Sequence, residues 1–138
     1  MNQYTFNDIN VGMTETFTVE ITEAMMESFM KITGDTNPLH CSDAYAKAEG
    51  HPGRVVYGML SSSFYSTLAG IYLPGEYSLL LNVDTRMNNP VYIGDKLTIT
   101  GTVFEKHEMG KLIEVKGVIR NQNKNKISSA ILRISLRK

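Results

Sequence analysis

The second half of the chain alternates between apolar and polar residues, as strands with one buried face do. The apolar members fall into four runs, which are Leu79, Leu81 and Val83; Leu97, Ile99 and Val103; Ile113, Val115 and Ile119; and Ala130, Leu132, Ile134 and Leu136. Turns are expected at Glu108 to Lys111 and at Asn121 to Lys126, where Gly and Asn favour a positive φ. The pattern predicts an antiparallel sheet.

The first half of the chain changes to helical spacing. Thr16 to Ile21 is typical of a short strand, and Thr22 is placed to cap the helix that follows. One broad apolar face of that helix is made by Met25, Met26, Phe29, Met30 and Ile32. Gly34 is suited to end it, and Ser42 is a second candidate cap, opening a short helix from Asp43 to Ala48.

A third helical pattern runs from Gly58 to about Tyr72. Its apolar residues recur every three or four positions, at Leu60, Phe64, Leu68 and Ile71. Serines fill many other positions, and no charged residue occurs up to Leu73. Because a surface helix needs a charged face, this helix is expected to be buried and enclosed by other structure. The expected architecture is a single α+β domain, residues 1–138, with a curved antiparallel sheet wrapped around a long central helix.

Composition excludes several classes of partner. Fourteen basic and fourteen acidic residues cancel, so there is no electrostatic sign of a nucleic acid or an anionic membrane. No apolar run approaches the roughly 20 residues that a membrane-spanning helix requires. The N-terminal stretch lacks the basic start and apolar run of a signal peptide, and the single Cys41 has no partner for an internal disulfide. We therefore expect a cytoplasmic protein.

The segment from Gly34 to His40 carries the strongest chemical signal. Pro38 fixes its own φ and drives Asn37 out of the helical region, so this segment is expected to be a loop and not a helix. Such a loop can bring Asp35 and His40 together, and a carboxylate with an imidazole can move a proton to and from water. The alternative is a plain turn, because Gly, Asp, Asn and Pro all favour turns for local backbone reasons.

Three sequence blocks resemble, in the same order, those of a known family. The first is FMKITGDTNPLH, from Phe29 to His40; the second is VVYGML, from Val55 to Leu60; and the third is PVYIGD, from Pro90 to Asp95. The N-terminal stretch FNDINVG also fits. On these blocks the chain resembles the single-domain MaoC-like dehydratases and is similar to the (R)-specific enoyl-CoA hydratases. The resemblance implies the hot-dog fold, and the first block is the one specific to the reaction.

The resemblance also implies the reaction, which is addition of water across the C2=C3 bond of a trans-2-enoyl thioester, or its reverse. Asp35 and His40 match the catalytic pair. We expect His40 to be the base, because an imidazole titrates near neutral pH, and Asp35 to orient the water. Either of the two can deliver the proton to C2. Gly58 matches the glycine whose backbone N–H, at the start of a helix, stabilises the negative charge that forms on the thioester oxygen.

Three further residues are expected near the substrate. Asn37 matches the asparagine that braces the loop. Tyr57 departs from the family pattern, since many relatives have histidine there. It is expected to line the acyl pocket or to bond a polar substituent of the substrate, the alternative being that it packs outward. Arg54 is the best candidate for contact with the phosphates of coenzyme A, because its loop leads directly to Gly58.

Two other functions fit the same scaffold. Some hot-dog acyl thioesterases place their acid on the central helix, and residues 58–73 carry none. A non-catalytic acyl-binding domain would have no need of both Asp35 and His40. The expected substrate is an acyl thioester of coenzyme A or of an acyl carrier protein. No metal or other cofactor is expected, because His40, His51 and His107 match no ligand spacing. The resemblance implies a homodimer, or a dimer of dimers, with the acyl pocket at the junction.

Overall fold

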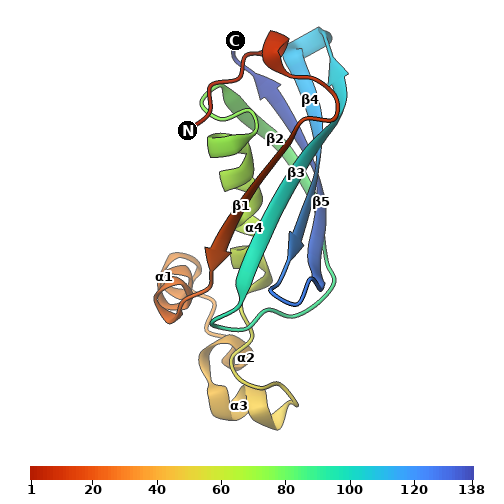
Figure 1. Ribbon diagram of the computed structural model, residues 1–138. Coiled ribbons are helices and arrows are strands. Elements are labelled where there is room, and N and C mark those ends of the chain that lie inside the picture. Colours follow the sequence, from red (N-terminus) through yellow and green to blue (C-terminus); the bar gives the residue numbers. More distant parts are fainter.

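The computed structural model describes all residues, 1–138, and contains one five-stranded antiparallel sheet with a helix along one face (Figure 1). The strands lie in the order β1-β3-β4-β5-β2. Helix α4 runs along the sheet, whereas α1, α2 and α3 gather at one end. The bounds are β1 Thr14–Glu20, α1 Glu23–Thr33, α2 Pro38–Cys41, α3 Asp43–Ala48, α4 Gly58–Thr67, β2 Ser78–Met87, β3 Lys96–His107, β4 Leu112–Arg120 and β5 Lys126–Leu136.

The buried core lies between α4 and the three middle strands. Every second residue of these strands faces it, and the buried set includes Leu97, Ile99, Val103, Ile113, Val115, Ile119, Ala130, Leu132, Ile134 and Leu136. The predicted inward faces of β3, β4 and β5 are therefore confirmed. Two strand glycines let the residues of the central helical stretch approach the sheet closely. A Cβ on Gly101 would lie 2.6 Å from Leu68 Cδ2, and a Cβ on Gly117 would lie 2.5 Å from Tyr65 Cε1.

Strand β2 departs from the predicted phase. Its pairing with β5 shifts between Leu80 and Asn82, so that Leu81 forms a bulge. Leu80 and Val83 pack against the core, whereas Leu79 and Leu81 are 53% and 56% exposed. The prediction that Leu79, Leu81 and Val83 share the inward face is wrong, because a bulge changes which side chains point inward.

The caps of the first helices are as predicted. The Thr22 hydroxyl accepts a hydrogen bond from the Met25 N–H at 3.2 Å, and Gly34 ends α1 in the left-handed region with φ +72°. Ser42 caps α3 in the same way, accepting from the Tyr45 N–H at 3.2 Å. These caps set where the chain leaves α1 and enters α3, and so fix both ends of the segment that carries Asp35 and His40.

As predicted, helix α4 begins at Gly58 and the helical course continues to Tyr72. Its last part, Leu68–Tyr72, is a wider π-helical turn. One side faces the core, where Leu60, Ser61, Ser62, Tyr65, Leu68 and Ala69 are buried. The other side is open, because Met59, Ser63, Ser66 and Ile71 are exposed. The prediction that other structure encloses this helix is therefore wrong for the single chain, and its lack of charge marks a face that the chain itself does not cover.

The hairpin turns lie where they were expected. Gly110 takes a φ of +77° in the first turn, whereas Lys124, and not an asparagine, takes the positive φ of +62° in the second. None of the helices has the length and hydropathy required to cross a bilayer.

Candidate active site

The segment after α1 holds Asp35 in a defined position. The Asp35 Oδ1 accepts a hydrogen bond from the Asn37 N–H at 3.0 Å, and the Asn37 Oδ1 accepts one from the Leu39 N–H at 3.0 Å. Asn37 therefore caps the one-turn helix α2, with Pro38 at its first position, where a missing N–H costs nothing. The expectation that no part of this segment is helical is wrong. The amide oxygen of Asn37 is used for that cap.

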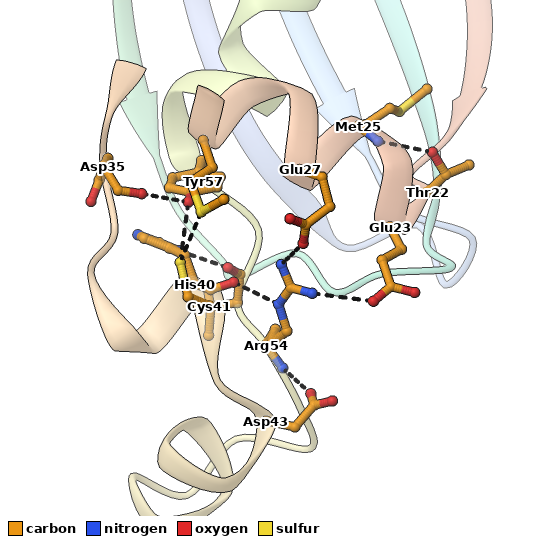
Figure 2. Close-up of polar contacts among 12 residues, drawn as sticks. Thr22, Glu23, Met25, Glu27, Asp35, His40, Cys41, Asp43, Arg54 and Tyr57 are labelled. Carbon is orange, nitrogen blue, oxygen red and sulfur yellow. Dashed lines mark hydrogen bonds and ion pairs between the residues drawn. The ribbon is translucent and has the colours of Figure 1, made fainter. Parts of the chain in front are cut away.

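His40, in the last turn of α2, is oriented by a backbone carbonyl. Its Nδ1 lies 2.7 Å from the Val55 carbonyl oxygen (Figure 2). Because a carbonyl only accepts, Nδ1 carries the proton in the neutral ring and Nε2 carries the lone pair. Nε2 is therefore the nitrogen that can take a proton from water.

Tyr57 contacts both catalytic candidates, Asp35 and His40. It is only 2% exposed, and its hydroxyl donates a hydrogen bond to the Asp35 carbonyl oxygen at 2.7 Å (Figure 2). Its ring centroid lies 4.2 Å from that of His40. Burial, and next a contact of 3.6 Å with the Cys41 thiol, raises the pKa of Tyr57 to about 12. The hydroxyl donates its proton to a backbone carbonyl of the protein itself, and so does not make the expected hydrogen bond to substrate. The ring does line the cavity described below, and the alternative of an outward side chain is wrong.

Arg54 is also placed differently from the expectation. Its side chain is 10% exposed, and its guanidinium pairs with Glu27 at 3.0 Å and Glu23 at 3.4 Å, both on α1 (Figure 2). Its Nε donates to the His40 carbonyl oxygen at 2.7 Å. A guanidinium neutralised in this way has little charge to offer a phosphate. The geometry supports a positioning role, in which Arg54 fastens the His40 backbone to α1, and not the expected contact with coenzyme A.

Gly58 supplies a free backbone donor. It is the first residue of α4, and its N–H makes no hydrogen bond within the chain, as expected at a helix start. The positive end of the helix dipole adds to the attraction of this N–H for a negatively charged oxygen. Gly58 lines a cavity of about 290 Å³, here called the Asp35 cavity, together with Phe29, Asp35, His40, Tyr57 and Met87. The structure therefore brings Asp35, His40, Tyr57 and Gly58 together, and leaves Asn37 and Arg54 outside the lining.

A second cavity adjoins the first. It measures about 320 Å³, is here called the Ile127 cavity, and is lined in part by Val55, Val91 and Ile127. His40, Gly58 and Met87 line both cavities. Sequence reasoning missed Met87, an apolar residue outside the three blocks, whose place in both cavities depends on contacts distant in the chain.

One cluster has side chains that could ligate a metal. Ligand atoms of Glu105, His107 and Glu114 lie within 4.8 Å of one another. His107 Nε2 lies 3.1 Å from a Glu105 carboxylate oxygen, and Glu114 pairs with Arg133 at 2.7 Å, so these side chains already have partners within the chain. They stand at the ends of β3 and β4 away from α2 and α3 (Figure 1), and have no part in the site at Gly58.

The sheet and its helix define a hot-dog protein, in which a carboxylate and an imidazole line one cavity beside a helix N-terminus. The chain belongs to the MaoC-like family: the family model described as the MaoC like domain matches residues 8–125. The family expected from the three sequence blocks is therefore confirmed.

Named relatives agree with this assignment. An (R)-specific enoyl-CoA hydratase from Rhodospirillum rubrum is 36% identical over 98 residues, which is 71% of this chain and 68% of the relative. A 3-hydroxybutyryl-CoA dehydratase from Methylorubrum extorquens is 32% identical over 100 residues, 72% of this chain and 64% of the relative. Among solved structures, the unliganded R-hydratase PhaJ1 from Pseudomonas aeruginosa superposes with a TM-score of 0.91 at 27% identity, covering 96% of this chain and 84% of that one. The expected hot-dog fold and an enzyme of the hydratase–dehydratase class are confirmed.

Proposed function

We propose that this chain hydrates trans-2-enoyl thioesters to (R)-3-hydroxyacyl thioesters, or catalyses the reverse dehydration. The observation that carries the proposal is the Asp35 cavity, in which a carboxylate, an imidazole and a free helix N–H line one space. The names of the relatives support coenzyme A as the carrier of the acyl group. The (R) configuration of the product is likewise taken from those relatives.

His40 acts as the base in the proposed mechanism. Its Nδ1 is occupied by the Val55 carbonyl, so Nε2 accepts a proton from water as the water oxygen bonds to C3. The electron pair of the C2=C3 bond moves toward C1 and places negative charge on the thioester oxygen. A proton from the Asp35 and His40 pair then reaches C2, which completes the addition of water.

Asp35 orients the water. Its Oδ1 is held by the Asn37 N–H, and its Oδ2 has no hydrogen-bond partner within the chain, so Oδ2 is free to accept from water. The Gly58 N–H then stabilises the oxygen at C1, helped by the helix dipole. Loss of a donor of this kind typically costs on the order of 10²–10³ in rate.

A second copy of the chain is part of this proposal. The open side of α4 includes Met59 at 63% exposure, and the edge strand β2 exposes Leu79 and Leu81. Edge strands and apolar helix faces are commonly covered by another chain. We expect a homodimer, or a dimer of dimers, at micromolar concentration. Sedimentation that detects only a species of the 15.4 kDa monomer would contradict this assembly.

The test is the loss of enoyl-thioester absorbance on addition of the protein to a panel of trans-2-enoyl-CoA substrates of increasing length. Asp35→Asn and His40→Asn should each lower kcat/KM by at least about 10². His40→Asn keeps a donor near the Val55 carbonyl, so the protein should stay folded. Matched controls are Asp84→Asn and His107→Asn, two exposed residues outside the Asp35 cavity.

Each outcome separates the candidate functions. Hydration that survives in either site variant would overturn the assigned pair. Release of free coenzyme A in place of hydration would identify a thioesterase, and binding without turnover would identify an acyl-binding domain. Enoyl thioesters of an acyl carrier protein, run in the same assay, decide the carrier.

A further inference from the structure

The space beside Gly58 is occupied by a side chain from the end of β2. A Cβ placed on Gly58 would lie 2.3 Å from Met87 Sδ and 2.9 Å from Met87 Cε, far inside normal contact distance. The absence of a Cβ at Gly58 therefore makes room for the Met87 thioether. The thioether therefore lies on the Cβ side of the same residue whose N–H is the proposed donor.

Met87 also stands where the two cavities meet. It lines both the Asp35 cavity and the Ile127 cavity, together with His40 and Gly58. Methionine is unbranched, with three side-chain torsions, and adapts to the shape of its surroundings. Met87 is 53% exposed, and its side chain forms a partition between the two cavities.

The proposed reaction determines which part of the substrate faces this partition. C1 must lie at the Gly58 N–H and C3 near the water held by Asp35 and His40, so C2 lies between them. In this placement C2 lies next to Met87, which lines both cavities together with His40 and Gly58. We propose that Met87 is a specificity-determining residue, whose thioether excludes substituents at C2 of the enoyl thioester. This inference rests on the proposed hydration and adds a discrimination that the reaction alone does not require.

Crotonyl-CoA and its 2-methyl derivative test the proposal directly. One extra methyl group in a fitted apolar site typically changes discrimination by about 10–200-fold. Met87→Ala should therefore raise the ratio of kcat/KM for the 2-methyl substrate to kcat/KM for crotonyl-CoA by at least about 10-fold. Met87→Leu, which keeps most of the volume, should raise this ratio far less. Comparing one ratio between variants cancels the lower intrinsic reactivity of the methylated alkene.

A matched control is Met109→Ala, because Met109 is 92% exposed in a distant turn and should leave the ratio unchanged. A second pair of variants tests the contact itself. Gly58→Ala should reduce hydration of crotonyl-CoA, and part of that loss should be recovered in Gly58→Ala/Met87→Ala, where the colliding thioether is gone. Thermal melting of each variant separates a loss of stability from a loss of activity.

The outcomes distinguish a failure of the role of Met87 from a failure of the proposed hydratase function. No hydration of crotonyl-CoA or of longer enoyl thioesters by the wild type would overturn the proposed function and the role of Met87 with it. Wild-type hydration with an unchanged substrate ratio in Met87→Ala would overturn the role of Met87 alone. A ratio that rises equally in Met109→Ala would also contradict it, because the effect would not arise at Gly58.

Discussion

Replacing Tyr57 with phenylalanine removes one hydroxyl and keeps the ring. That hydroxyl makes the 2.7 Å hydrogen bond to the Asp35 carbonyl, whereas the ring packs 4.2 Å from His40 and 5.0 Å from Phe29 between centroids. Tyr57→Phe therefore releases Asp35 and leaves the packing around His40 in place. We expect a variant that folds, binds substrate and turns it over slowly.

The expected size of the effect follows from these contacts. A hydrogen bond between neutral groups contributes about 0.5–1.5 kcal/mol to stability, and the Asp35 carbonyl, on an exposed residue, can be hydrated once the hydroxyl is gone. The loss of stability should therefore be about 1 kcal/mol or less. The loss in kcat should be larger. Without the Tyr57 hydroxyl the Asp35 backbone can shift, and a misplacement near 1 Å can cost up to about 100-fold in rate.

Steady-state hydration of the best enoyl-CoA substrate is the assay, with thermal melting run in parallel. We expect kcat to fall by about 10- to 100-fold and KM to change little, because the hydroxyl does not reach the substrate. Tyr4→Phe is the control: it removes a hydroxyl that donates to Glu15 at 3.0 Å, near the chain terminus that lies away from α2. A wild-type kcat in Tyr57→Phe would refute the reasoning. A rise in KM alone would also refute it, because that result would indicate that the hydroxyl contacts the substrate.

Three further predictions follow from the same structure. Arg54→Lys should lower stability by about 1–3 kcal/mol and reduce kcat, with KM for enoyl-CoA unchanged; a KM raised for enoyl-CoA but not for enoyl-pantetheine would show a phosphate contact instead. Nitrogen NMR of the neutral His40 ring should show the proton on Nδ1, and a proton on Nε2 would contradict the proposed base. Burial raises the pKa of Tyr65 from 10.0 to about 12, so its contribution to stability should be constant below pH 10 and be lost as pH rises from 10 to 12. Tyr65→Phe should reduce the total fall over this range, and the part that remains includes the contribution of Tyr57. Urea titrations at several pH values measure the slope, which can reach about 1.4 kcal/mol per pH unit for one group.

Local signals in the sequence were sufficient for much of the fold. Thr22 and Gly34 bound α1 because capping depends only on neighbouring backbone groups. Alternation identified the inward faces of β3, β4 and β5, since these strands lie in the middle of the sheet and their register shifts, at Val103/Glu105 and Ile119/Arg120, fall at the ends of the alternating runs. β2 was different, because the bulge at Leu81 arises from pairing with β5 and has no local signature.

The functional groups of the candidate site were predictable from the sequence, whereas the contacts that hold them in position were not. Asp35, His40 and Gly58 stand in motifs whose residue types match the reaction, and the structure brings them to one cavity. Arg54 and Tyr57 were assigned to substrate because both lie beside Gly58 in the sequence. Their side chains are used inside the protein, which becomes visible only when α1 and α2 are in place.

The segment from Arg54 to Gly58 explains how an exposed loop can hold the proposed catalytic pair, Asp35 and His40. Arg54 Nε binds the His40 carbonyl, the Val55 carbonyl orients the His40 ring, and the Tyr57 hydroxyl binds the Asp35 carbonyl. The Val56 N–H meanwhile donates to the Val91 carbonyl at 2.8 Å, which fastens the segment to the loop that leads into β3. Gly58, whose N–H is the proposed oxyanion donor, ends the same segment. The proposed base, the proposed water-orienting carboxylate and this N–H are thus all held by one extended stretch, which favours a fixed relative geometry.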